Sequence, residues 1–188
     1  MMDALSFANE RLDPIQPLTP TIGDEFQGLF AELVSALEAT LMVRLRLLGE
    51  MDVRFGIGSG ALFAFDPDRA PFEQDGPAWW SARRAVDLVR ERSQGQERPR
   101  GLRTRWADAD ADRFEVASVN AFLAGRDELV AAMDARDAAA MLGLLADEPL
   151  TRIAEAEGVS ASALSQRAIR GGLYAIRYAH AELREATA

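Results

Sequence analysis

The chain has 188 residues, 48% hydrophobic and 27% charged, so its length and composition suit a globular protein with a real core. The absence of cysteine excludes disulfides, thiolate metal sites and a cysteine nucleophile, and the single histidine argues against a multi-histidine metal site or a Ser-His-Asp triad. No apolar run approaches the roughly 18 residues of a membrane span, and no signal-peptide pattern opens the chain. We therefore expect a soluble, cytoplasmic protein that does not enter membranes.

Charge is distributed unevenly along the chain, which has a net charge of −9 and only arginine as its basic residue. From residue 149 onward five arginines stand against four glutamates, so this tail carries +1 and residues 1–148 carry −10. A strongly acidic body disfavours nonspecific binding to nucleic acid, which depends on neutralising phosphates. The near-neutral tail is not subject to that objection.

The first part of the chain alternates helices with short strands. Apolar residues at helical spacing indicate helices, and Gly or Pro clusters indicate the turns between elements. The elements expected, in order, are a helix over 2–12, a hairpin with strands over 18–22 and 25–30, a helix over 33–48, a glycine-rich strand over 53–62, a loop over 66–77, a helix over 77–92, a polar turn over 93–101 and a short strand over 102–106.

The second part reads as helical throughout. Residues 114–146 have a helical pattern, and residues 150–186 predict a helix, a turn, a second helix and a terminal helix. The chain is therefore expected to be α+β in front and all-helical behind.

The hairpin turn Gly23-Asp24-Glu25-Phe26 is the first candidate site. An acid held on a tight turn at a sheet edge can bind Mg²⁺ for phosphoryl chemistry, with Asp24 and Glu25 as the ligands. Gly and Asp are also the residues that such turns prefer for conformational reasons alone. The four residues by themselves leave both interpretations open.

Four segments follow one another in the chain: TIGDEFQG over 21–28, RFGIGSG over 54–60, DGPAWWSAR over 75–83 and a helix-turn-helix at the C-terminal end. Their order resembles the palm-type domain of class III nucleotidyl cyclases and, more closely, the SatD family of bacterial proteins. The resemblance implies an incomplete palm (ferredoxin-like, cyclase-like) antiparallel sheet with helices over 1–110, a helical connector over 111–148, and a helix-turn-helix with a terminal helix over 149–188.

Two departures from the cyclase pattern argue against cyclase turnover. The first strand that would supply a second metal carboxylate is absent, so Asp24 lacks its partner, and we expect either a start codon placed too late or a sheet completed by a second chain. Arg84 matches the cyclase arginine, but Trp80 stands at the asparagine position, and an indole offers one donor and no acceptor.

A run of eight arginines falls between residues 83 and 105, against three acids. It can be a solvated helix face followed by a charged loop, or a site for the phosphates of a nucleotide or nucleic acid, with Arg83 and Arg84 as the candidate ligands. The residues are Arg83, Arg84, Arg90, Arg92, Arg98, Arg100, Arg103 and Arg105.

The tail has the pattern of a DNA-binding helix-turn-helix. Leu150, Ile153 and Ala154 form an apolar face, Gly158 supplies the turn, and Leu164 packs the second helix back on the first. A set of polar residues then projects toward DNA from the segment 149–172. These candidates are Ser160, Ser162, Ser165, Gln166, Arg167 and Arg170.

The leading hypothesis is a DNA-binding transcriptional regulator whose degenerate cyclase-like domain dimerises the chain or senses a ligand such as a nucleotide. The one candidate cofactor is Mg²⁺, and a homodimer would pair two recognition helices. The alternative is an Mg²⁺-dependent nucleotide-binding or nucleotide-converting enzyme that requires an upstream strand or a second chain. A protein interaction module is the third hypothesis.

Overall fold

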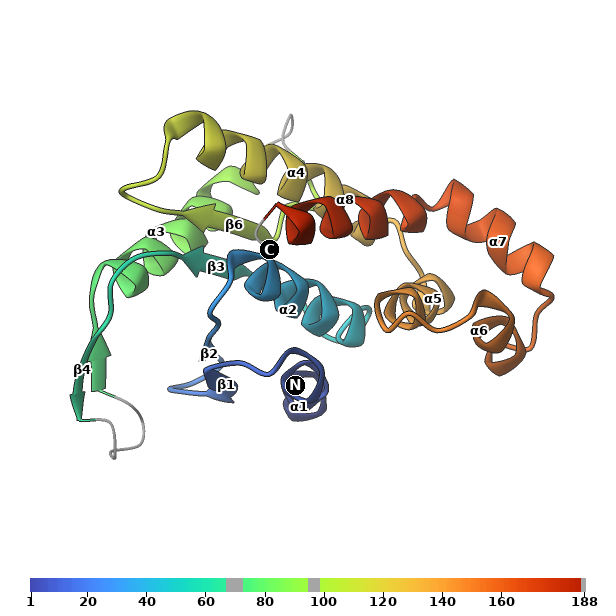
Figure 1. Cartoon of the computed structure of the whole chain (residues 1–188), viewed down its shortest axis with the longest axis horizontal. Coiled ribbons are helices and arrows are strands. Elements are labelled where there is room, and N and C mark those ends of the chain that lie inside the picture. Colours follow the sequence, from blue (N-terminus) through green and yellow to red (C-terminus); the bar gives the residue numbers. More distant parts are fainter. Residues whose placement is uncertain (67–72, 95–98, 187–188) are drawn as a thin grey trace. The chain divides into compact units, whose positions relative to one another are not determined.

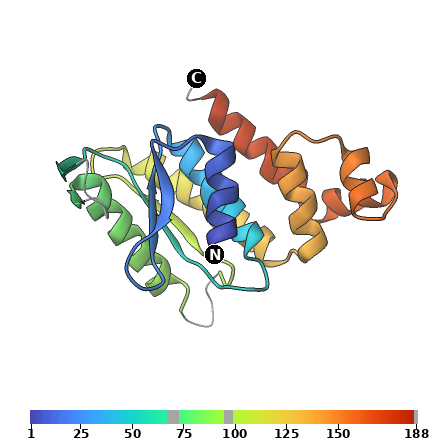
Figure 2. The same cartoon turned by 90° about the horizontal axis from the view of Figure 1, so that it is seen from below.

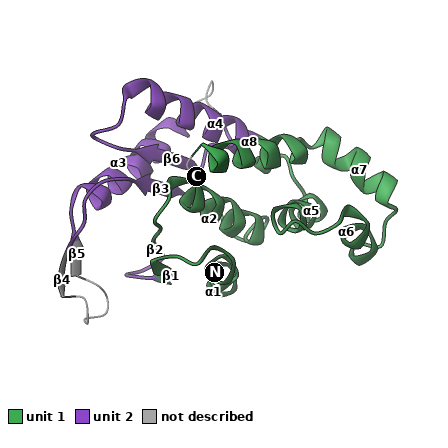
Figure 3. Cartoon of the chain, viewed as in Figure 1, with its two compact units in different colours: residues 1–19, 27–52, 129–188 green, residues 20–26, 53–128 purple. Residues whose placement is uncertain are grey.

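The structure is a computed structural model that describes residues 1–66, 73–94 and 99–186 (Figure 1). Internal packing divides the chain into two compact units (Figure 3). Unit 1 comprises residues 1–19, 27–52 and 129–188, and unit 2 comprises residues 20–26 and 53–128. The two units interleave along the sequence, whereas the three segments expected from the sequence follow one another.

Unit 2 is built around two parallel strands and the helix that connects them. β3 (Phe55–Gly58) pairs in parallel with β6 (Thr104–Ala107), with Gly56 opposite Arg105. Helix α3 (Pro77–Arg92) lies against this pair in Figure 1 and in Figure 2. Its bounds are those predicted, because Pro77 occupies the first helical turn, where a missing N–H costs nothing.

Glycines in β3 allow α3 to approach the strand backbone. A Cβ on Gly58 would stand 2.0 Å from the carbonyl oxygen of Ala78, and one on Gly56 would stand 2.1 Å from that of Ala82. These distances are far below van der Waals contact, so any side chain at either position would displace the helix. The glycine-rich strand predicted from the sequence is confirmed over its central residues, with this close packing as its physical reason.

The described strands agree with the expected α+β fold, but one of their pairs is parallel where we expected an antiparallel sheet. The described residues form three two-stranded sheets, and the β3–β6 pair is parallel because α3 carries the chain back to the starting edge. The loop expected over 66–77 was wrong at both ends, where β4 and β5 pair antiparallel, and residues 67–72 lie outside the described part. The other strands are β1 (Gln16–Pro20), β2 (Phe26–Leu29), β4 (Phe63–Asp66) and β5 (Glu73–Asp75).

Side chains of α4 (Arg113–Ala131) complete the backbone hydrogen bonding of β6. Asn120 accepts from the Trp106 N–H at 3.0 Å and donates to the Trp106 carbonyl at 2.9 Å. Asp127, two turns later, accepts from the N–H groups of Arg103 at 2.7 Å and Thr104 at 2.6 Å. Side chains of a helix therefore act as hydrogen-bond partners for the backbone along this edge of β6.

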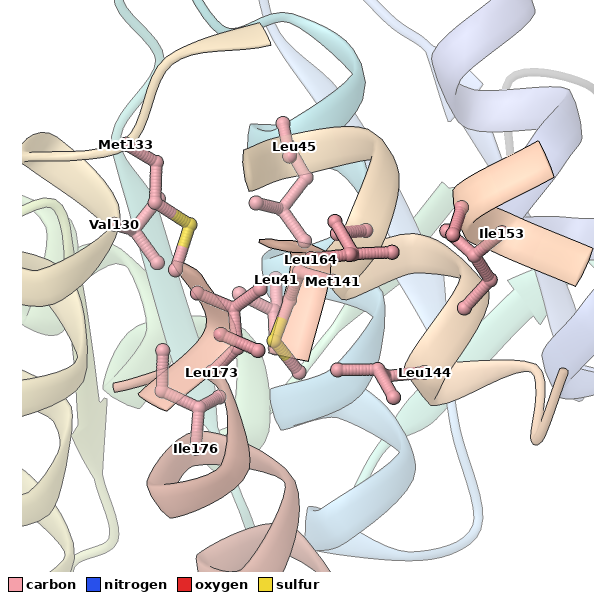
Figure 4. Packing of buried hydrophobic residues seen from close by; sticks show 14 residues of the cluster. Leu41, Leu45, Val130, Met133, Met141, Leu144, Ile153, Leu164, Leu173 and Ile176 are labelled. Carbon is pink, nitrogen blue, oxygen red and sulfur yellow. The ribbon is translucent and has the colours of Figure 1, made fainter. Parts of the chain in front are cut away.

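Unit 1 is helical apart from the stems of the β1–β2 hairpin. An apolar core of unit 1 joins residues from α2, α5, α6, α7, α8 and the end of α4, as Figure 4 shows. Leu41, Met141, Leu164 and Leu173 are each at most 1% exposed within it. The helices are α1 (Met2–Leu12), α2 (Leu33–Arg46), α5 (Ala135–Leu145), α6 (Leu150–Ala156), α7 (Ala161–Arg170) and α8 (Leu173–Glu185).

These bounds confirm the helices predicted over 2–12 and 33–48 and the helix, turn, helix and terminal helix predicted over 150–186. The helical segment 114–146 consists of two helices, because Asp134 and Asp137 form a reciprocal capping box that begins α5. Among the described residues, none of the helices combines the length and apolar character needed to cross a bilayer.

Candidate functional site

Helices α6 and α7 present the polar surface that the sequence singled out in the tail. The turn over residues 157–160 joins them, with Gly158 in the left-handed region at φ 64°. Ser160 begins α7, and its hydroxyl accepts the N–H of Ala163 at 3.1 Å. Leu164 and Ala168 face the core of unit 1, so the opposite side of α7 is left to solvent.

The exposed side of α7 carries a polar stripe. Ser162, Gln166 and Arg170 are all exposed, and their spacing of four residues places them one above the other along the helix. Ser165 is half-buried beside them, and Ile169, 59% exposed, lies between the polar positions. The structure therefore brings three of the six predicted DNA-contacting residues onto one accessible line, while the Ser160 hydroxyl serves the helix cap.

Arg167 forms an ion-pair bridge from α7 to α5. Its Nε and Nη2 donate to Asp137, the latter at 3.1 Å, and Nη2 also donates to Asp134. Hydrogen bonds to Asp137 first, and to Asp134 next, raise the pKa of Arg167 above its ordinary value. Two carboxylates neutralise this guanidinium, so Arg170 is the exposed arginine of α7.

A small open hollow lies beside this bridge, with a volume of about 170 Å³. Arg136, which lines the hollow, has its Nε 3.6 Å from a carboxylate oxygen of Glu157. Two of the three arginines that line the hollow, Arg136 and Arg167, are therefore ion-paired. The lining residues are Arg136, Val159, Ala163, Leu164, Arg167 and Arg170.

In unit 2, the hairpin turn brings two predicted sites together. Both oxygens of the exposed Glu25 accept from Arg83 of α3, at 3.0 and 3.2 Å. The Arg83 hydrogen bond, followed by its charge, lowers the pKa of Glu25. The predicted metal ligand and the predicted phosphate ligand therefore neutralise each other, while Asp24 and Arg84 remain exposed.

This geometry does not favour the Mg²⁺-dependent alternative. Within the described ranges, no group of three or more acidic or histidine side chains is arranged to hold a metal ion. Arg83 binds both oxygens of Glu25 and neutralises its charge, which makes this carboxylate a weaker ligand for a cation in this arrangement.

Trp80 has a local structural role at the start of α3. Its Nε1 donates to Asp75 Oδ1 at 2.6 Å, and the same oxygen accepts the Gly76 N–H at 2.8 Å. Gly76 has φ 135°, a conformation that a residue with a side chain adopts at a cost. The DGPAWW segment therefore fixes where the strand β5 ends and the helix begins.

In a comparison with protein-family models, residues 6–178 match the SatD family. The chain belongs to the SatD family. A search of curated proteins and a search of solved structures each returned no match. The matched range includes the β1–β2 hairpin, α3 and the α6–α7 pair. Both candidate regions therefore lie within the residues that match the SatD family model.

Sequence reasoning missed several charged residues that organise these regions of the SatD-family chain. The Asp134 and Asp137 pair, spaced three residues apart at a helix start, is a recognisable capping signal. Arg126 and Asp127 on α4 are buried and ion-paired at 3.3 Å, and charges within an apolar helical stripe are the only sequence signal for them.

Proposed function

We propose that this protein is a DNA-binding transcriptional regulator in which α6 and α7 form a helix-turn-helix and α7 is the recognition helix. The observation that carries the proposal is the exposed line of Ser162, Gln166 and Arg170 on a helix whose other side is anchored in a core. A rigid helix with polar side chains along one face suits the major groove, which admits an α-helix.

The chemistry of the line fits base reading. A glutamine can bond adenine through two hydrogen bonds, and an arginine can do the same with guanine. Ser162 stands near the capped N-terminus of α7, where exposed N–H groups favour a phosphate. Arg167 holds α7 against α5 through its ion pairs. In this proposal Gln166 and Arg170, which are exposed, contact the DNA directly.

Electrostatics require more than one copy of the chain on the DNA. The tail carries +1 while residues 1–148 carry −10, so a single chain gains little from the phosphates. Two copies related by two-fold symmetry would place two α7 helices in successive major grooves about 34 Å apart. In this proposal unit 2, the degenerate cyclase-like part, provides dimerisation or ligand sensing.

The test is fluorescence anisotropy with labelled duplexes from around the protein's own gene, at two salt concentrations. We expect saturable binding by two chains per duplex that weakens with salt and outcompetes random duplex. Gln166→Ala and Arg170→Ala should each weaken specific binding about tenfold or more, in line with the 1–3 kcal/mol of a bidentate base contact. Arg113→Ala, the same loss of charge at an exposed residue of α4, should leave it unchanged.

The proposal fails if the folded protein binds no duplex at low salt. It also fails if Arg113→Ala weakens binding as much as the two α7 variants do, because the interaction would then follow overall charge and not the surface of α7.

A further inference from the structure

Helix α3 sorts its arginines onto two stripes with different surroundings. Arg83 donates a hydrogen bond to Glu25, and the charge of Arg90, seven residues later, also lowers the pKa of Glu25. Arg90 lies 4.0 Å from Asp87 as well. Arg84 and Arg92, with Leu88 between them, follow the neighbouring stripe at spacings of four residues. Both arginines of the first stripe therefore have a carboxylate nearby.

The second stripe faces another cation, Arg105 of β6. Arg105 pairs in register with Gly56, and residues paired across neighbouring strands share one face of a sheet. The Cβ position of Gly56 points at Ala82 and Val86 of α3, so Arg105 lies on the face that α3 covers. The position of Arg105 in β6 therefore places this residue next to α3.

Arg105 is held in an unfavourable place for a lone cation. Its side chain is half-buried, and its Nε is inaccessible and has no hydrogen-bond partner in the described part of the chain. Burial is the largest cause that lowers the pKa of Arg105, and the positive charges of Arg92 and Arg84 lower it further. Among the residues that the structure describes, the charges that shift the pKa of Arg105 are those of these two arginines, and no carboxylate is one of them.

A half-buried cation with an inaccessible, unpaired Nε and two like charges nearby costs folding free energy. An anionic ligand would remove that cost. Arginine binds phosphate oxygens through two parallel N–H groups, which makes it the residue of choice for this ligand. Over eight residues the stripe from Arg84 to Arg92 extends about 12 Å along the helix, long enough for more than one phosphate group.

We propose that Arg84, Arg92 and Arg105 form a metal-independent binding site for a small molecule that carries adjacent phosphate groups. The site excludes Arg83, which Glu25 occupies, and it includes two arginines that the sequence motifs did not single out. A long nucleic acid is a poorer occupant, because the acidic body repels its backbone on either side of a three-arginine cluster. The proposal is independent of DNA binding by α7.

The test is calorimetric titration of the full chain with inorganic triphosphate in buffer with a chelator, with ATP and CTP as further arms. We expect saturable binding of inorganic triphosphate. If ATP or CTP binds more tightly than inorganic triphosphate, the ligand of the site is a nucleotide. Arg105→Gln and Arg92→Gln should each lose about tenfold or more in affinity, the scale of a charge-assisted contact. Arg90→Gln removes the same charge from the same helix and should change affinity less than twofold.

Thermal melts keep the result interpretable if a variant folds poorly. Without ligand, Arg105→Gln should melt at a higher temperature than the wild type, because it removes a half-buried charge that Arg84 and Arg92 repel. The same variant should lose the increase in melting temperature that triphosphate gives the wild type. Arg105→Lys should keep the charge, yet bind triphosphate more weakly than the wild type because it lacks the guanidinium fork.

The proposal is overturned if neither triphosphate nor a nucleotide binds the folded wild type. It is also overturned if Arg90→Gln lowers the affinity for triphosphate as much as Arg105→Gln does. A third contrary result is that only random-sequence duplex binds the wild type and that Arg105→Gln weakens this binding, because the cluster would then be a nucleic-acid site.

Discussion

Arg167 on α7 binds Asp137 on α5, a residue 30 positions earlier that also belongs to the capping box of α5. One guanidinium therefore connects the start of α5 to the exposed helix that we propose to read DNA. Arg167 and Gln166 are neighbours in sequence, but they point to different surroundings, so their substitution should have different consequences.

Arg167→Gln should lower the melting temperature of the protein, because the buried carboxyl group of Asp137 would lose its guanidinium partner and keep only the Asp134 N–H. Gln166→Ala should leave the melting temperature unchanged, since its side chain is exposed. Thermal melts by circular dichroism separate the two. Equal melting temperatures for Arg167→Gln and the wild type would show that the bridge contributes nothing to stability.

The sequence predicted local structure well because local structure has local signals. Pro77 and the glycines of β3 specify the ends of α3 and the strand beneath it within a few residues. Ion pairs such as Glu25 with Arg83, 58 positions apart, leave no periodic signal, because their formation depends on how the elements pack. Individual roles within the candidate sites therefore became visible only from the structure.

Gly58→Ala should destabilise unit 2 strongly, by about 3 kcal/mol or more, since the new Cβ would stand 2.0 Å from a helix carbonyl that cannot move alone. Urea unfolding followed by circular dichroism measures this. Gly125→Ala is the matched control, because Gly125 lies in α4 with nothing within 4 Å of its Cβ position. It should stabilise the protein by up to about 1 kcal/mol through helix propensity. Similar effects of the two substitutions would contradict the close packing of β3 and α3.

Asn120→Leu should cost about 2–4 kcal/mol, because it leaves both backbone groups of the buried Trp106 without their hydrogen bonds. A protonated Asp offers both an acceptor oxygen and an O–H donor, so at a pH where the new acid is protonated Asn120→Asp should be less destabilised than Asn120→Leu. Urea unfolding monitored by tryptophan fluorescence reports on both. If Asn120→Leu unfolds at the wild-type urea concentration, α4 does not complete the bonding of β6.

Glu38 in α2 should make stability depend on pH in the direction opposite to an ordinary paired carboxylate. Burial, the largest cause, raises its pKa above 4.5, and the charge of Arg184 only partly offsets that effect. A carboxyl with a raised pKa in the folded state favours folding most below its unfolded pKa, and this contribution is lost as pH rises through the folded pKa. Ionised Glu38 therefore destabilises the protein at neutral pH.

Glu38→Gln keeps the shape and hydrogen-bonding capacity of the side chain but cannot ionise. It should melt at a higher temperature than the wild type at pH 7, and the difference should shrink as pH falls toward the unfolded pKa of about 4.3. Thermal melts from pH 7 to pH 4 measure the difference directly. Arg184 stays with a neutral acceptor in the variant, and its side chain is 57% exposed, so losing the ion pair costs little. A variant less stable than the wild type at pH 7 would mean that the ion pair with Arg184 outweighs the burial of Glu38.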